Sequence, residues 1–151
     1  MKLRALLSLT AIVVVGAMGA GVAGASSTGT EYFTAVATSE NGPITVVASG
    51  PISAVGSDTV LGTHRDQFVF PAGTVTVRHE FITRSQSFDV STCTFTFKEK
   101  GTYVLTRGTG AYAHVIGSGH YKASAVGTGC DPNQPLTSFI QIIQAHGPIT
   151  L

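Results

Sequence analysis

Four side chains in this sequence are candidates for contact with a small ligand: His79, Tyr103, Arg107 and Tyr121. An imidazole titrates near neutrality, so His79 could donate or accept a proton inside a cavity. The two tyrosines could turn their hydroxyls toward the same ligand, and Arg107, which precedes a glycine, could bind a carboxylate. Structural roles remain open for all four: a hydrogen-bonded core histidine, tyrosines bonded to backbone, and an ordinary surface arginine.

Several classes of catalytic and metal site are not indicated. His114 and His120 flank a turn predicted near Gly117, but two imidazoles without a third ligand make a poor zinc or copper site, so we expect no metal. The sequence has no Ser-His-Asp ordering, paired-carboxylate motif, Gly-x-Ser-x-Gly elbow or phosphate loop. Strand-forming residues follow Gly108-Thr-Gly, which excludes a dinucleotide-binding fingerprint because that motif must open a helix.

The residues that must position these side chains read as β-strands. Between Gly101 and Val126, two strand-forming runs are interrupted by glycines at 108, 110, 117 and 119, which supply the positive φ angles and close approaches that turns and bulges need. Period-two alternation recurs from Glu31 onward, and no window shows a convincing 3.6-residue apolar period. The predicted fold class is therefore all-β, with antiparallel up-and-down strands.

We expect strands at residues 31–38, 44–49, 52–56, 67–70, 74–83, 92–99, 102–106, 111–115, 119–126 and 138–146, some of which merge to give eight to ten. Alternation along 74–82 places Val75, Val77, His79 and Phe81 on one face, which predicts that they point inward. The same pattern predicts a further inward set: Cys93, Phe95, Phe97, Tyr103, Leu105, Tyr121, Ala123 and Ala125. The last strand is apolar on both faces, and one face could contact another subunit of a homo-oligomer.

The first 25 residues resemble a secretory signal peptide. Lys2 and Arg4 precede an apolar stretch, and Ala23-Gly24-Ala25 fits the small-x-small cleavage rule. A retained membrane anchor is the alternative, because the stretch is nearly long enough to span a bilayer. We expect cleavage to leave a single extracellular domain, residues 26–151, that does not contact a membrane.

Two further features of the exported part limit its chemistry. Cys93 and Cys130 are its only cysteines, and in an oxidising compartment they predict one disulfide, worth about 4 kcal/mol in the chain-entropy model. Without Lys2 and Arg4, seven basic residues stand against eight acidic ones. That balance argues against nucleic acid or an anionic membrane as partner, since both need a concentrated basic patch.

Many short antiparallel strands leave two exposed edges unless the sheet closes into a barrel or folds into a sandwich. We favour a closed barrel over a sandwich. An eight-stranded barrel has an interior just wide enough to be filled by side chains or to hold one small ligand.

The chain also resembles a known superfamily of barrels. Thr102-Tyr-Val-Leu-Thr-Arg-Gly-Thr-Gly-Ala-Tyr-Ala and Gly117-Ser-Gly-His-Tyr resemble the glycine-rich hairpin of the allene oxide cyclase and dirigent barrel superfamily. Leu61-Gly, Arg65-Asp-Gln-Phe-Val-Phe-Pro-Ala-Gly-Thr-Val-Thr-Val, Cys93, Cys130 and Gly147-Pro-Ile are similar to secreted actinobacterial proteins with this barrel. The resemblance implies an eight-stranded antiparallel, calycin-like barrel, often oligomeric.

In that superfamily the lumen guides an apolar reactive molecule. The plant cyclase closes an unsaturated fatty-acid epoxide, dirigent proteins orient phenoxy radicals, and some bacterial relatives cyclise polyketides. The resemblance implies that no metal or organic cofactor takes part. No catalytic residue of those enzymes can be aligned onto a position of this chain.

Three hypotheses about function share these features. The barrel could bind a small apolar or aromatic molecule, it could be a cofactor-independent cyclase or dirigent-type enzyme, or it could be a filled structural or surface-interaction protein. A lumen of roughly 300 Å³ or more, lined by His79, Tyr103 or Tyr121, would favour binding over the filled barrel.

Overall fold

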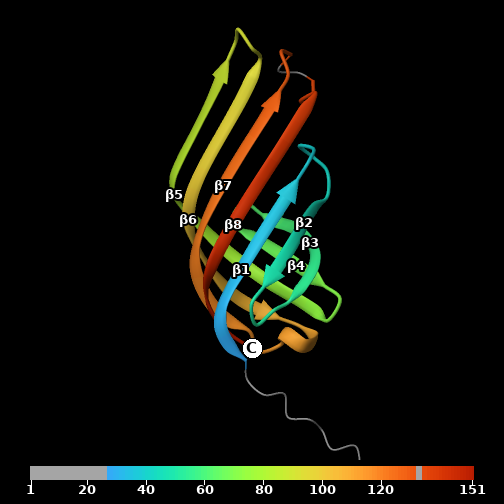
Figure 1. The fold of residues 1–151 in the computed structure, drawn as a ribbon, viewed down its shortest axis with the longest axis vertical. Coiled ribbons are helices and arrows are strands. Elements are labelled where there is room, and N and C mark those ends of the chain that lie inside the picture. The colour runs from blue at the N-terminus through green and yellow to red at the C-terminus, as the bar shows by residue number, and fades with distance from the viewer. Residues whose placement is uncertain (1–26, 132–133) are drawn as a thin grey trace, which may run out of the picture.

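The computed structural model describes residues 27–131 and 134–151, which form a closed barrel of eight antiparallel strands (Figure 1). Each strand pairs with the next along the chain, and β8 pairs with β1 to close the sheet. The strands are β1 (Thr28–Ala37), β2 (Ile44–Ser49), β3 (Ala54–Gly62), β4 (Arg65–Phe70), β5 (Gly73–Asp89), β6 (Thr94–Gly108), β7 (Ile116–Thr128) and β8 (Ser138–Thr150). The predicted all-β barrel is confirmed, and the sandwich alternative is wrong.

The connection between β6 and β7 differs from the sequence prediction. Instead of a strand at 111–115 there is a 3-10 turn, η1 (Gly110–Tyr112), where Gly110 adopts a φ of 60° and the backbone N–H of Ala111 donates to the carbonyl of Ala72. Tyr112 is buried with its ring edge against Phe70, which holds the connection over the end of the barrel. Gly117 consequently lies inside β7, so the turn predicted there is wrong.

Two further predictions concern the leader sequence and the disulfide. The predicted signal peptide, residues 1–25, lies outside the described residues. Across 27–131 and 134–151, the structure contains no helix with the length and apolar character needed to cross a membrane. The predicted disulfide between Cys93 and Cys130 is present, which is compatible with an extracellular protein.

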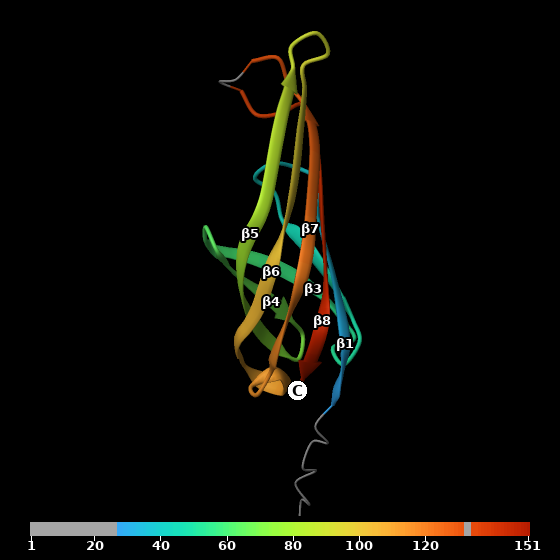
Figure 2. The ribbon, with the colours of Figure 1, turned by 90° about the vertical axis from the view of Figure 1, so that its left-hand side faces the viewer.

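Unequal strand lengths divide the barrel into two ends. β2 and β4 have six residues each, whereas β5 has 17 and β6 has 15. The long strands β5–β8 therefore extend past the short ones as a projecting sheet, seen in Figures 1 and 2. We call this part, residues 84–99, 123–131 and 134–143, the open end. The C-terminus and η1 lie at the other end of the molecule (Figure 1).

Side chains fill the barrel at that other end, which we call the filled end and define by its buried core of Val46, Ile52, Val75 and Ile149. Each of these four is at most 2% exposed. Rings of the same cluster contact one another in series: Phe33 with Phe68, Phe68 with Phe70, and Phe70 with Tyr112. The interior of this half has the dense packing of an ordinary protein core.

A β-bulge in β5 changes which side chains face inward. Phe81 pairs with Gly101 and Thr83 pairs with Lys100, so Ile82 is an extra residue on β5. Below the bulge Val75 and Val77 point inward as predicted, but Phe81 is 46% exposed and stacks on His64, so its inward prediction is wrong. After the bulge, the even-numbered residues of β5 face inward instead.

The other residues predicted to point inward are buried to different degrees. Tyr103, Leu105, Tyr121, Ala123 and Ala125 are buried, which confirms the alternation along β6 and β7. Phe95 and Phe97 are only half-buried because they belong to the open end. The strands predicted at 92–99 and 102–106 are one strand, β6, and Cys93 lies in the turn that precedes it.

Candidate ligand cavity

A cavity of about 590 Å³ lies where the filled end gives way to the open end. All eight strands contribute to its lining. Its walls are mostly apolar and include Ile44, Phe68, Phe97 and Ile143. The polar side chains in the lining come mainly from β3, β4, β5, β6 and β7, and several of them contact one another.

Three of the four predicted ligand contacts line this cavity: His79, Tyr103 and Tyr121. Arg107 does not. It is exposed, pairs with Thr76 near the end of β6, and so belongs to the filled end. The structure therefore separates Arg107 from the other three.

Two glycines make room for the two tyrosine rings. Gly101 is directly opposite Tyr121 in the β6–β7 register, and Gly119 is directly opposite Tyr103. A Cβ atom at Gly101 would lie 2.5 Å from the Tyr121 ring, and one at Gly119 would lie 2.8 Å from the Tyr103 ring. Any larger residue would displace these rings, so the glycine-rich pattern sets where the two hydroxyls lie.

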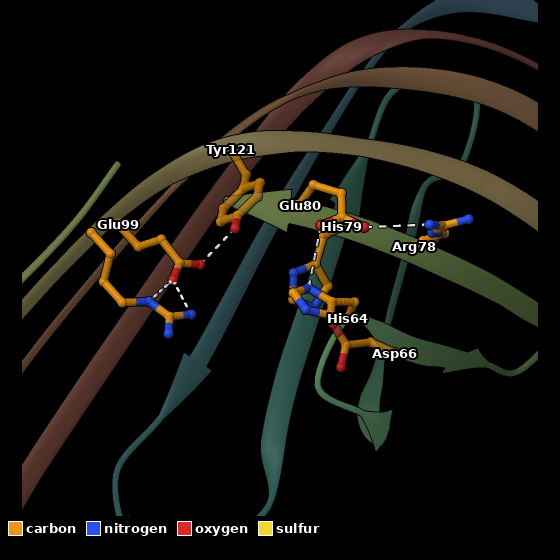
Figure 3. Close-up of polar contacts among 8 residues, drawn as sticks. His64, Asp66, Arg78, His79, Glu80, Glu99 and Tyr121 are labelled. Carbon is orange, nitrogen blue, oxygen red and sulfur yellow. Dashed lines mark hydrogen bonds and ion pairs between the residues drawn. The ribbon is translucent and has the colours of Figure 1, made fainter. Parts of the chain in front are cut away.

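His79 forms an ion pair with Asp66 on the neighbouring strand β4. Its Nε2 is 3.1 Å from the Asp66 carboxylate, and its ring meets the Tyr121 ring edge-on at 5.7 Å. The hydrogen bond with Asp66 raises the pKa of His79, although partial burial opposes this. Figure 3 shows the pair beside Tyr121. The charged imidazolium is thus favoured more strongly than in a free histidine.

Asp58 of β3 also lines the cavity, and its pKa is strongly shifted. Burial, followed by repulsion from the negative charge of Asp66, raises the pKa of Asp58 to about 7. Its Oδ1 is buried and has no hydrogen-bond partner among the residues that the structure describes. A buried carboxyl oxygen without a partner is costly, so this oxygen favours a ligand or water that can bond to it.

A second polar chain runs along the cavity wall from β7 through β6 to β5. The hydroxyl of Tyr121 donates to Glu99 at 2.5 Å, and Arg84 Nε donates to the other carboxylate oxygen at 2.6 Å. Burial and the bond to Glu99 raise the pKa of Tyr121, so it stays protonated and acts as a donor. Figure 3 shows Tyr121 and Glu99 joined in this way.

Tyr103 stands apart from both chains. Its hydroxyl is buried and, like Asp58 Oδ1, has no hydrogen-bond partner in the described residues. Burial raises the pKa of Tyr103 to about 12, so the hydroxyl is neutral and available as a donor.

Sequence reasoning missed Asp58, Asp66, Glu99 and Arg84. Glu99 could have been found, because it continues the inward series of Phe95 and Phe97. Arg84 could not, since its inward direction depends on the bulge after Phe81. Asp58 and Asp66 belong to β3 and β4, and the β3–β4 and β4–β5 registers place them beside β5.

The histidines considered for a metal site are not together. His114 is exposed in the β6–β7 connection, whereas His120 lies in β7 opposite Thr102 and His146. Residues 27–131 and 134–151 contain no group of three or more His, Cys, Asp or Glu side chains that could hold a metal ion.

Comparisons with family models, with curated proteins and with solved structures gave no match to this chain. The resemblance to allene oxide cyclase and dirigent barrels therefore stays a prediction.

Proposed function

We propose that this is a secreted protein that binds one small, largely apolar or aromatic molecule in the barrel cavity. The observation that carries the proposal is a cavity of about 590 Å³. Its lining residues include two buried polar atoms that have no hydrogen-bond partner within 27–131 and 134–151, Asp58 Oδ1 and the Tyr103 hydroxyl oxygen. A filled structural barrel would not need such a space.

The size and lining of the cavity fit this class of ligand. Small-molecule sites commonly span about 300–1,000 Å³, with apolar walls and a few well-placed polar groups. Phe68, Phe97 and Ile143 supply apolar wall here. The polar groups give a ligand a fixed orientation rather than most of its binding free energy.

The two unpartnered atoms indicate what polar group the ligand carries. Asp58 accepts a hydrogen bond when ionised and can donate one when protonated, and the Tyr103 hydroxyl can donate. A ligand hydroxyl suits either atom, because it donates and accepts. We therefore favour an apolar or aromatic molecule with a hydroxyl group.

A second candidate is a cofactor-independent cyclase or isomerase using the same cavity. Asp58, with its pKa near 7, lies in one lining with the Asp66–His79 pair, and such groups can exchange protons with a substrate near neutrality. Incubation with unsaturated epoxides and with phenoxy-radical donors, followed by chiral product analysis, tests this candidate. Equal product ratios with and without protein would contradict it.

The binding proposal is tested with the neutral fluorescent probe N-phenyl-1-naphthylamine. Ala123→Leu places a larger side chain in the cavity lining and should weaken probe binding about tenfold. Ser124→Leu, the next residue on the outer face of β7, and Arg107→Gln should leave binding unchanged. Equal effects of the two leucine variants, or no binding by the unchanged protein, would overturn the proposal.

A further comparison tests the polar group. The protein should bind 2-naphthol more tightly than naphthalene, and this preference should fall about fivefold in Asp58→Asn or Tyr103→Phe. Native mass spectrometry of the protein purified from its own culture medium shows whether a small molecule accompanies it.

A further inference from the structure

Away from the cavity, the outer face of the sheet gathers positive charge at one place. The register sets Lys100 of β6 opposite Lys122 of β7, and His120 of β7 opposite His146 of β8. These are adjacent rows on one face, because His120 and Lys122 are two residues apart on the same strand. All four side chains are exposed.

This arrangement does not stabilise the sheet. Like charges directly opposite each other on antiparallel strands are destabilising. Among the described residues, no carboxylate lies within ion-pair distance of Lys100 or Lys122. Glu80, the acid on β5 in the row of Thr102, contacts Arg78 and His64 instead. Two uncompensated lysines on adjacent strands are expected where an anion binds.

The surface is hollowed at these rows. A groove of about 620 Å³ contacts Lys100, Lys122, His120, His146, Gln144 and Tyr32. Tyr32 of β1 stacks on His146, with ring centroids 6.1 Å apart and planes inclined by 20°. The groove therefore combines cations, an amide that can bond to hydroxyls, and a flat pair of rings.

We propose that this groove binds an acidic carbohydrate, meaning a sugar ring that bears a carboxylate or sulfate group. The two lysines would hold the anionic group, Gln144 would bond to sugar hydroxyls, and the Tyr32–His146 rings would support the apolar face of the ring. Phe33, Tyr121 and Ala145 line both the groove and the cavity, but the lysines, Gln144, Tyr32 and His146 line the groove alone, and the proposal does not rest on the function proposed above.

Nucleic acid fits the groove less well. Its binding sites follow the phosphate backbone with an extended row of basic side chains. Here only Lys98 continues the lysine series along this face of β6, and it does not line the groove. Two lysines and two histidines match one or two anionic groups on a short saccharide.

The test is fluorescence anisotropy at low ionic strength with labelled hexasaccharides and the purified full protein. A sulfated heparin fragment and a carboxylated oligogalacturonate should bind, and the comparison between them distinguishes sulfate from carboxylate. Neutral maltohexaose should not bind. The variant Lys100→Gln/Lys122→Gln should lose about tenfold or more in affinity for the acidic saccharides.

Two variants separate the groove from general surface charge. Lys98→Gln removes one charge on the same face outside the groove and should change affinity less than about twofold. Tyr32→Ala should weaken saccharide binding about fivefold while leaving the weak binding of inorganic sulfate unchanged. Thermal melting of each variant confirms that it folds, and Ala123→Leu should bind saccharides normally.

Three results would overturn the proposal. The first is equal binding of neutral and acidic saccharides. The second is a loss in Lys98→Gln as large as that in the double lysine variant. The third is tighter binding of a single-stranded DNA oligonucleotide than of either acidic saccharide, which would assign the groove to nucleic acid.

Discussion

The filled end of this barrel is enclosed by short and long strands together, whereas only the long strands β5–β8 extend through the open end. At the filled end, Val46 and Val75 have no exposed surface, and aromatic rings occupy the interior. At the open end the strands β5–β8 continue without β2–β4 beside them, so Phe95 and Phe97 stay half-buried. The comparison shows that strand length decides which part of the barrel is packed and where a cavity is left.

Two acids, Glu31 and Asp58, differ in the same way between the packed core and the cavity. Glu31 has no exposed surface, and its Oε2 accepts a 2.7 Å hydrogen bond from the backbone N–H of Ile52. Burial raises the pKa of Glu31, as it does for Asp58. Glu31 is enclosed by the packed core, whereas Asp58 borders a cavity that a molecule can enter. Only the second acid is placed to contact a ligand.

The largest expected effect comes from removing one ring at each end. Phe70→Ala should lower the free energy of unfolding by about 4 kcal/mol, because Phe70 is 4% exposed and contacts Phe68 and Tyr112. Phe97→Ala should cost about 1 kcal/mol, since the cavity already borders that ring. Urea denaturation measures both values, and equal losses would contradict the division into two ends.

The next effect concerns the disulfide that joins the two connections at the tip of the open end. Replacing both cysteines, Cys93→Ser/Cys130→Ser, should lower the free energy of unfolding by about 3 kcal/mol. Amide hydrogen exchange should quicken most in residues 85–99 and 124–131, because they lose their tether. The core amides of β2 should keep their order of protection, and a uniform increase across the barrel would contradict this account.

The smallest effect is a pH dependence that arises at the cavity. Because the pKa of Asp58 rises from 3.8 to about 7 on folding, the folded state binds the extra proton, and stability should fall as the pH rises from about 4 to 7. The pKa of His79 is also raised, and its stabilising charge is lost as the pH rises further through its folded pKa. The two groups therefore act in the same direction.

Asp58→Asn isolates the contribution of the acid. The variant should be more stable than the unchanged protein at pH 7.5 by about 1–2 kcal/mol, less than the full shift implies because the side chain borders an open cavity. The fall between pH 4 and 7 should become shallower, while a slope above pH 6.5 remains from His79. Thermal melting at several pH values measures both, and an unchanged profile would contradict the assigned pKa.

Much of the fold was predictable because β-strands alternate strictly. Val75, Tyr103 and Ala123 point inward as their positions predict. The connection after Gly108 was misread because Ala-Tyr-Ala-His-Val also alternates, although a positive φ at Gly110 turns the chain there. An alternating pattern alone does not reveal that a single glycine turns the chain.

The cavity was less predictable than the fold. His79, Tyr103 and Tyr121 came from alternation on β5, β6 and β7, the strands with the clearest pattern. The acids that contact or face them were missed, because the registers of β3 with β4 and of β4 with β5 bring Asp58 and Asp66 to His79. Interactions between neighbouring strands need the register, and the sequence does not supply it.

The extra residue at Ile82 has a consequence for how this barrel tolerates insertions and deletions. Val75, Val77 and His79 occupy odd positions, whereas Arg84 and the residues beyond it face inward from even ones. Deleting Ile82 would therefore let β5 alternate without interruption, with Thr83 still opposite Lys100 and Arg84 still opposite Glu99. The lower core and the charged wall of the cavity would both stay in frame, so this is a position at which β5 tolerates the loss of a residue.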